Sequence, residues 1–65
     1  MKIRYLEDTD TLLIELKPGS VAGTHGLDEN TLLDLDAQGQ VLAITLEHAT
    51  ARAELSSFSF VRIAA

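Results

Sequence analysis

The 65-residue chain contains no cysteine, which excludes disulfides, thiolate metal sites and cysteine nucleophiles together and fits a reducing compartment. A chain of this length buries only about 60% of the surface that its unfolded form exposes, so we expect an isolated domain to be marginally stable. Small domains usually add disulfides, metals or oligomerisation to a small core. Here oligomerisation is the remedy that stays open.

Basic residues and long apolar runs are also scarce. Ten acidic residues stand against five basic ones, and the formal net charge of −5 repels a phosphate backbone. The same charge favours association with a basic protein. No apolar run approaches the ~18 residues of a membrane span, and the amino-terminal segment has no signal-peptide core. We therefore expect a cytoplasmic protein that binds neither nucleic acid nor membranes.

What the chain does contain is alternation of apolar and polar residues. This period of two predicts five strands, over residues 2–6, 11–16, 21–27, 31–36 and 41–47. An alanine-rich segment at about 48–55 favours a short helix, which must dock on the sheet because so short a helix is unstable alone in water. Residues 57–63 alternate again and are interpreted as a sixth strand or an arm laid on a neighbour.

These elements predict one domain over residues 1–65. We expect an α+β fold that is mainly β: an antiparallel β-meander of five to six strands with one short C-terminal helix. Keeping the apolar residues of each hairpin on one face fixes the register. The expected pairs are Ile3 with Ile14, Tyr5 with Leu12, Leu33 with Ile44, and Leu35 with Leu42.

The same parity leaves a second apolar set on the opposite face of the sheet. One short helix covers only one face, so we predict that a second molecule covers part of the other. The predicted interface combines this second set with the two tail phenylalanines: Leu6, Leu13, Leu32, Val41, Ala43, Phe58 and Phe60.

Short motifs along the chain resemble a small bacterial domain family of unknown function, DUF2283. The resemblance runs over residues 1–53 and rests on residues 1–5, 10–16, 33–36 with Gly39, 41–44 and 49–50. It implies a β-meander with a short helix, no established catalytic activity, and an antitoxin-like role beside a small toxin. Ala43 and Thr45 stand where the family usually has Gly and Glu, so this chain lacks that glutamate.

Candidate chemistry is sparse. Asp34, Asp36 and Gly39 imitate the opening of a calcium loop, but Thr45 stands where the loop needs Glu, so we interpret them as strand aspartates and a hairpin glycine. His25 maps to the inward face, near Leu12 and Leu33. We interpret it as a packed strand residue, since zinc needs three or four converging ligands.

Glu7, Asp8 and Asp10 form an acidic loop that offers no desolvation for acid and base catalysis. Asp10 is interpreted as a turn residue bonded to nearby backbone. We therefore predict a non-catalytic, homo-oligomeric protein-interaction module without metal or cofactor, with a small basic protein as a further candidate partner. The alternative is a small metal-binding protein or hydrolase that uses His25 and the acidic loop.

Overall fold

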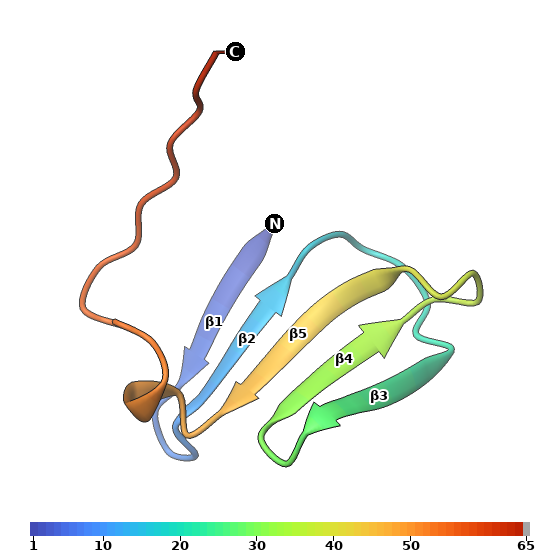
Figure 1. Ribbon diagram of the computed structural model, residues 1–65, viewed down its shortest axis with the longest axis horizontal. Coiled ribbons are helices and arrows are strands. Elements are labelled where there is room, and N and C mark those ends of the chain that lie inside the picture. The colour runs from blue at the N-terminus through green and yellow to red at the C-terminus, as the bar shows by residue number, and fades with distance from the viewer. Residues whose placement is uncertain (65) are drawn as a thin grey trace.

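The computed structural model describes residues 1–64, in which five antiparallel strands form one sheet (Figure 1). The elements are β1 (Lys2–Leu6), β2 (Thr11–Glu15), β3 (Gly23–Asp28), β4 (Thr31–Leu35), β5 (Val41–Glu47) and the 3-10 turn η1 (Ala49–Ala51). The mainly β class is confirmed, and the strand bounds lie within two residues of those predicted. No helix in the described chain is long and apolar enough to cross a membrane.

The strands lie in the order β1-β2-β5-β4-β3. The sheet is therefore a hairpin, β1–β2, joined to a three-stranded meander, β3–β4–β5, by a connection over residues 16–22 that brings β5 beside β2. His25 lies opposite Leu33 as predicted. Its expected proximity to Leu12 is wrong, because β4 and β5 lie between β3 and β2.

Three of the four expected residue pairs are confirmed: Ile3 with Ile14, Tyr5 with Leu12, and Leu33 with Ile44. The fourth is wrong, because a bulge sets Leu35 opposite Val41 and leaves Leu42 as the extra residue. The carbonyl of Leu42 instead accepts hydrogen bonds from the amides of Leu16 and Lys17, at 2.8 and 3.4 Å. The connection to β3 thus takes Leu42 out of the regular ladder.

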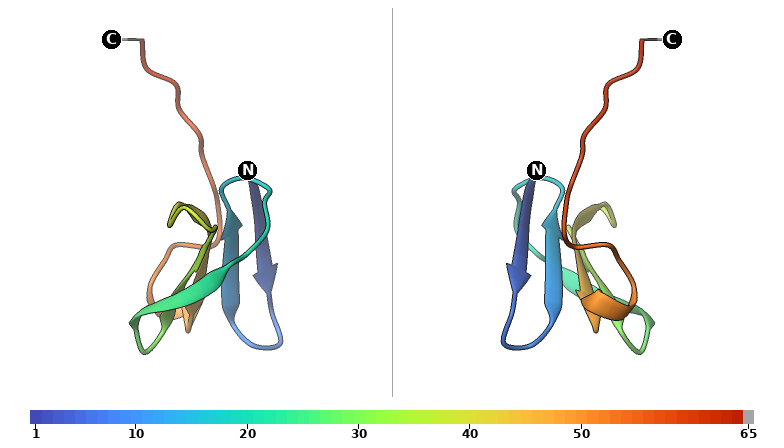
Figure 2. Two further views of the ribbon diagram at one scale, coloured as in Figure 1. Left: turned by 90° about the vertical axis from the view of Figure 1, so that its right-hand side faces the viewer. Right: turned by 90° about the vertical axis from the view of Figure 1, so that its left-hand side faces the viewer.

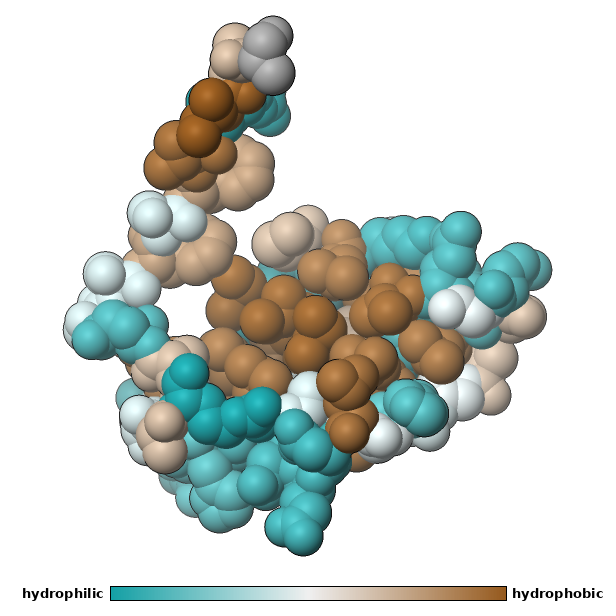
Figure 3. All heavy atoms as spheres, viewed as in Figure 1, coloured by the Kyte–Doolittle hydropathy of each residue, from teal (hydrophilic) through white to brown (hydrophobic). Residues whose placement is uncertain are grey.

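The two faces of the sheet differ. Residues paired across the ladder share a face, so the register collects a nearly continuous apolar set on the face turned toward the viewer in Figures 1 and 3. We call this set the open face: Ile3, Tyr5, Leu12, Ile14, Leu33, Leu35, Val41, Ile44 and Leu46. The opposite side is the reverse face.

The short C-terminal helix predicted at about 48–55 is not confirmed. The segment has only the three-residue turn η1, entered through His48 in the left-handed conformation with φ 55°. Asp10 binds the amides of Ala49 and Thr50, and the turn ends with the hydrogen bonds that the amides of Arg52 and Ala53 donate to the Ala49 carbonyl. So short an alanine-rich segment has too little intrinsic stability to extend the turn into a helix. A sixth strand is likewise absent from the described part of the chain, where the tail runs away from the sheet (Figure 2).

Candidate interaction surface

The open face is not covered by a second layer of structure. Apolar side chains buried within residues 1–64 are Leu12, Leu42 and Ala49, whereas Ile3 and Tyr5 remain 38% and 37% exposed. Domains normally bury an apolar sheet face against another layer. The sheet therefore presents an apolar surface, visible in Figure 3, that its own chain leaves largely uncovered.

The dimensions of the chain reflect this missing layer. Its accessible surface is 5061 Å², whereas a compact monomer of 7.0 kDa exposes about 4,000 Å². The radius of gyration is 13.0 Å, against about 10.7 Å for a compact domain of this length. The single-layered sheet and the extended tail both contribute to the excess surface.

A groove lies between the β1–β2 end of the open face and the base of the tail. Its volume is about 330 Å³, and its walls are formed by Ile3, Tyr5, Leu12 and Ile14 from the strands and by residues that include Leu55 and Phe58 from the tail. A neighbouring hollow of about 250 Å³ is lined by Met1, Ile3, Phe58 and Phe60. The tail thus begins to cover the open face without packing tightly on it.

Polar contacts hold the base of the tail at the end of the sheet, and we call them the clasp. Asp10 accepts hydrogen bonds from the Tyr5 hydroxyl at 2.6 Å, the Thr50 amide at 3.1 Å and the Thr50 hydroxyl at 2.8 Å. Arg52 donates to the Asn30 carbonyl at 2.6 Å and to the Thr31 hydroxyl at 2.5 Å. The clasp therefore ties the chain beyond β5 to the β1–β2 loop and the β3–β4 turn.

The clasp shifts the protonation equilibria of its members. The hydrogen bond from Tyr5, followed by those from Thr50, lowers the pKa of Asp10, and the same bond raises the pKa of Tyr5. The Asn30 amide, the Thr31 hydroxyl and the charge of Arg52 lower the pKa of Asp28. Donors on other segments thus stabilise Asp10 in its charged form, whereas Asp28 is stabilised mainly by donors of its own turn.

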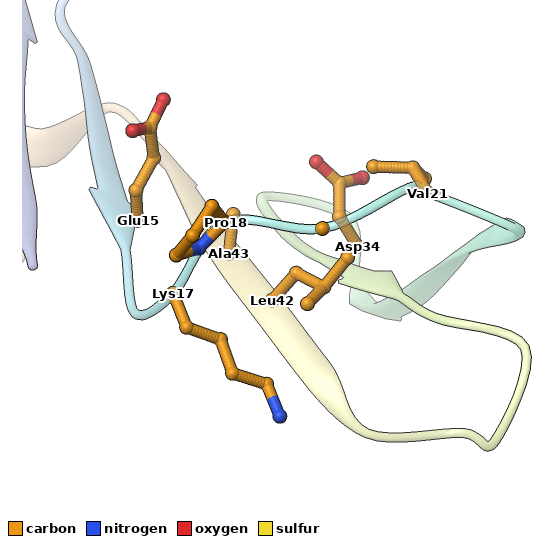
Figure 4. A pocket seen from close by; sticks show the side chains of 8 residues that line it. Glu15, Lys17, Pro18, Val21, Asp34, Leu42 and Ala43 are labelled. Carbon is orange, nitrogen blue, oxygen red and sulfur yellow. The ribbon is translucent and has the colours of Figure 1, made fainter.

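The reverse face carries polar side-chain pairs, and the connection over residues 16–22 covers part of it. Arg4 and Glu15 form an ion pair across β1 and β2, and the Thr24 hydroxyl donates to Asp34 at 2.9 Å. Leu42 is 4% exposed beside the connection to β3 (Figure 4). A Cβ added to Gly19 would meet Leu42 Cδ2 at 2.9 Å, so a larger residue at this position would displace the leucine side chain.

The residues of the predicted interface lie in three places. Leu6, Leu13, Leu32 and Ala43 lie on the reverse face, with Leu6 45% exposed, whereas the bulge brings Val41 beside Leu35 on the open face. The tail carries the others: Phe58 and Phe60 are 69% and 70% exposed. Their role as an interface stays a prediction.

The structure does not bring the candidate chemical residues together. His25 is exposed on β3, one edge of the sheet, and the acidic loop with Glu7 and Asp8 follows β1, the other edge. Asp36 binds the amides of Gln38 and Gln40 at 2.9 Å within its own turn. Within residues 1–64, no three His, Cys, Asp or Glu side chains gather as metal ligands would.

Sequence reasoning missed the clasp. Asp10 bonds Thr50, which lies 40 residues away, and not only its own turn. The signal in the sequence was weak: Asp tolerates the left-handed backbone that the turn requires, here with φ 54°. Arg52 carried no signal, because its partners are a carbonyl and a hydroxyl on a distant turn.

Comparison with known proteins identifies one match. A family model described as a protein of unknown function (DUF2283) matches residues 2–49, which span all five strands and the start of η1. No curated protein and no solved structure matches the chain.

Proposed function

The chain belongs to the DUF2283 family, and from that premise we propose that it is a non-catalytic protein-interaction module that self-associates through its open face. The observation that carries this proposal is the uncovered apolar layer. Contiguous exposed apolar surface on a soluble domain marks an interaction site. The open face extends across four of the five strands, β1, β2, β5 and β4.

The size of the exposed surface supports a second copy as the partner. The chain exposes roughly 1,000 Å² more than a compact monomer of its mass, and a standard interface buries about 800 Å² from each partner. Two such faces packed about 10 Å apart form a β-sandwich with one shared core. A two-fold axis lets the same face serve both copies.

The proposal is non-catalytic because the carboxylates of the β1–β2 loop and of the hairpin turns lie at the ends of the sheet, where no cavity of the described chain encloses them. Asp36 satisfies its own hairpin, and Asp10 and Asp28 have lowered pKa values, whereas a carboxyl group that serves as a general acid needs a raised one. A cytoplasmic location belongs to the same proposal and is supported by the absence of cysteine.

A small basic protein is a second candidate partner, as an antitoxin-like role requires. Most acidic residues lie at the clasp end of the sheet, on the β1–β2 loop, the β3–β4 turn and the segment after β5: Glu7, Asp8, Asp10, Asp28, Glu29, Glu47 and Glu54. Such a field favours a basic partner. The full chain should then retain a basic polypeptide at a one-to-one ratio, and combined Glu7→Gln, Asp8→Asn and Glu29→Gln changes should release it.

A matched pair of variants tests the proposed function. Leu32 and Leu33 are adjacent, half-buried leucines of β4 that lie on the reverse and the open face, respectively. We expect Leu33→Lys to weaken self-association about a hundredfold, as loss of a central interface residue does, and Leu32→Lys to leave it within about threefold. Light scattering after size-exclusion chromatography gives the mass, and circular dichroism confirms the sheet in both variants.

Three outcomes are informative. Loss of the assembly in Leu33→Lys alone supports the open face. Loss in Leu32→Lys alone assigns the interface to the reverse face, as the sequence predicted, and contradicts the open-face assignment. A folded wild-type chain that stays monomeric at every concentration contradicts the proposed function itself.

A further inference from the structure

We propose that residues 57–63, here called the arm, pack on the open face of a second copy, so that two copies exchange arms. This inference rests on the proposed self-association and names which segment of the partner occupies the surface. The arm carries four of the most exposed apolar side chains of the chain: Phe58 at 69%, Phe60 at 70%, Val61 at 71% and Ile63 at 83%.

The composition of the arm is that of a strand and not of a linker. Residues 57–60 alternate serine and phenylalanine, which places both aromatic rings on one side of an extended chain. The arm contains neither glycine nor proline, the residues that make linkers flexible or stiff. An extended segment that presents two aromatic rings on one side is suited to a complementary apolar surface, and Val61 and Ile63 add apolar side chains on the other side.

The arm passes the β1 edge of its own sheet, where Phe58 and Phe60 line a hollow with Met1 and Ile3, and does not continue across the face. The clasp fixes Thr50 and Arg52, Leu55 is half-buried against the β1–β2 end, and the chain then leaves the sheet (Figures 1 and 2). Within residues 1–64, no backbone hydrogen bond joins the arm to a strand. The β4–β5 part of its own open face therefore stays uncovered.

The length of the arm matches the surface it would cover. At roughly 3.3 Å per residue, residues 57–63 extend about 23 Å, and five strands about 4.8 Å apart span about 19 Å. An arm that crosses to a facing copy can therefore cover the side chains of its β4 and β5. Reciprocal exchange satisfies both open faces with one two-fold contact.

Photo-crosslinking distinguishes exchange from docking within one chain. Phe60 is replaced by p-benzoylphenylalanine, and this unlabelled variant is mixed with ¹⁵N-labelled wild-type chain and irradiated. We expect crosslinks between labelled and unlabelled chains, with the labelled peptide derived from residues 31–47. The matched control carries the same group at Leu6, which is 45% exposed on the reverse face, and should give no such product.

A second measurement keeps the test independent of the photo-reactive group. Phe58→Ser combined with Phe60→Ser, which removes both rings from one side of the arm, should raise the dissociation constant of the dimer at least tenfold, and Ser59→Ala should leave it unchanged. If the wild-type chain is dimeric but Phe60 crosslinks only within its own chain, arm exchange is overturned while the proposed function stands. If the wild-type chain is monomeric, both are overturned.

Discussion

The two faces of this sheet are built from the same strands but differ in polarity and in how far the chain covers them. On the reverse face, an ion pair between Arg4 and Glu15 separates apolar side chains, and the chain's own connection covers Leu42. On the open face, nearly all paired positions are apolar across four strands, and within residues 1–64 the tail approaches them at the β1–β2 end. A reverse face of this kind is suited to water, whereas the open face is the one that we propose a second copy covers.

The largest expected change in the stability of the monomer comes from truncating a covered leucine, compared with an uncovered one. Leu42→Ala should lower the free energy of unfolding by about 2–4 kcal/mol, because its side chain is 4% exposed and a cavity remains beneath the connection. Leu33→Ala, on the open face, should cost about half as much in dilute monomer. Urea unfolding below the dissociation constant measures both, and equal losses would contradict the contrast between the faces.

The clasp holds the base of the tail at the open face. Arg52→Ala removes the donors to the Asn30 carbonyl and to the hydroxyl of Thr31, a residue 7% exposed. We expect a loss of about 0.5–1.5 kcal/mol, the net range for an intramolecular hydrogen bond, because the Thr31 hydroxyl keeps its bond to Asp28. Thermal unfolding of Arg52→Ala beside Arg62→Ala, which changes the same residue type in the arm, measures it. Equal melting temperatures would show that the clasp contributes nothing.

A smaller change in stability is expected from substitutions in the connection that packs on Leu42 at the reverse face. Gly19→Ala brings a methyl group to 2.9 Å from Leu42 Cδ2, so the connection or the leucine must move, at a cost of about 1 kcal/mol. Gly23→Ala meets nothing within 4 Å and should gain about 0.5 kcal/mol, since alanine has less freedom to lose on folding. Denaturant midpoints compare the two variants. Destabilisation by Gly23→Ala alone would argue against this packing.

The smallest predicted effect is the pH dependence of the clasp. The pKa of Asp10 is lowered in the folded chain, so its contribution is complete above about pH 4 and is lost as the pH falls through the lowered value. The pKa of Tyr5 is raised in the folded chain, so its contribution to stability is complete below about pH 10 and is lost as the pH rises through the raised value. Asp10→Asn should flatten the acid limb of the melting temperature against pH, and Tyr5→Phe the alkaline limb. An unchanged acid limb in Asp10→Asn would contradict this assignment.

The sequence predicted the strands and much of the register because period-two patterning reports directly which residues share a face. It missed the bulge at Leu42 and the placement of β5 beside β2, since both depend on the connection over residues 16–22 and not on alternation. The predicted helix failed because a short alanine-rich segment has only a weak intrinsic preference, which long-range contacts such as those of Arg52 with Asn30 and Thr31 override. Without the helix that was expected to dock on the sheet, the open face stays largely uncovered.

Sedimentation equilibrium of the wild-type chain over a wide concentration range tests the central claim most directly, namely that a second copy covers the open face. We expect the mass to rise from that of one 7.0 kDa chain to twice this value, and a Leu33→Lys variant to stay at the lower mass. A well-folded wild-type chain whose mass stays at one copy throughout would contradict it.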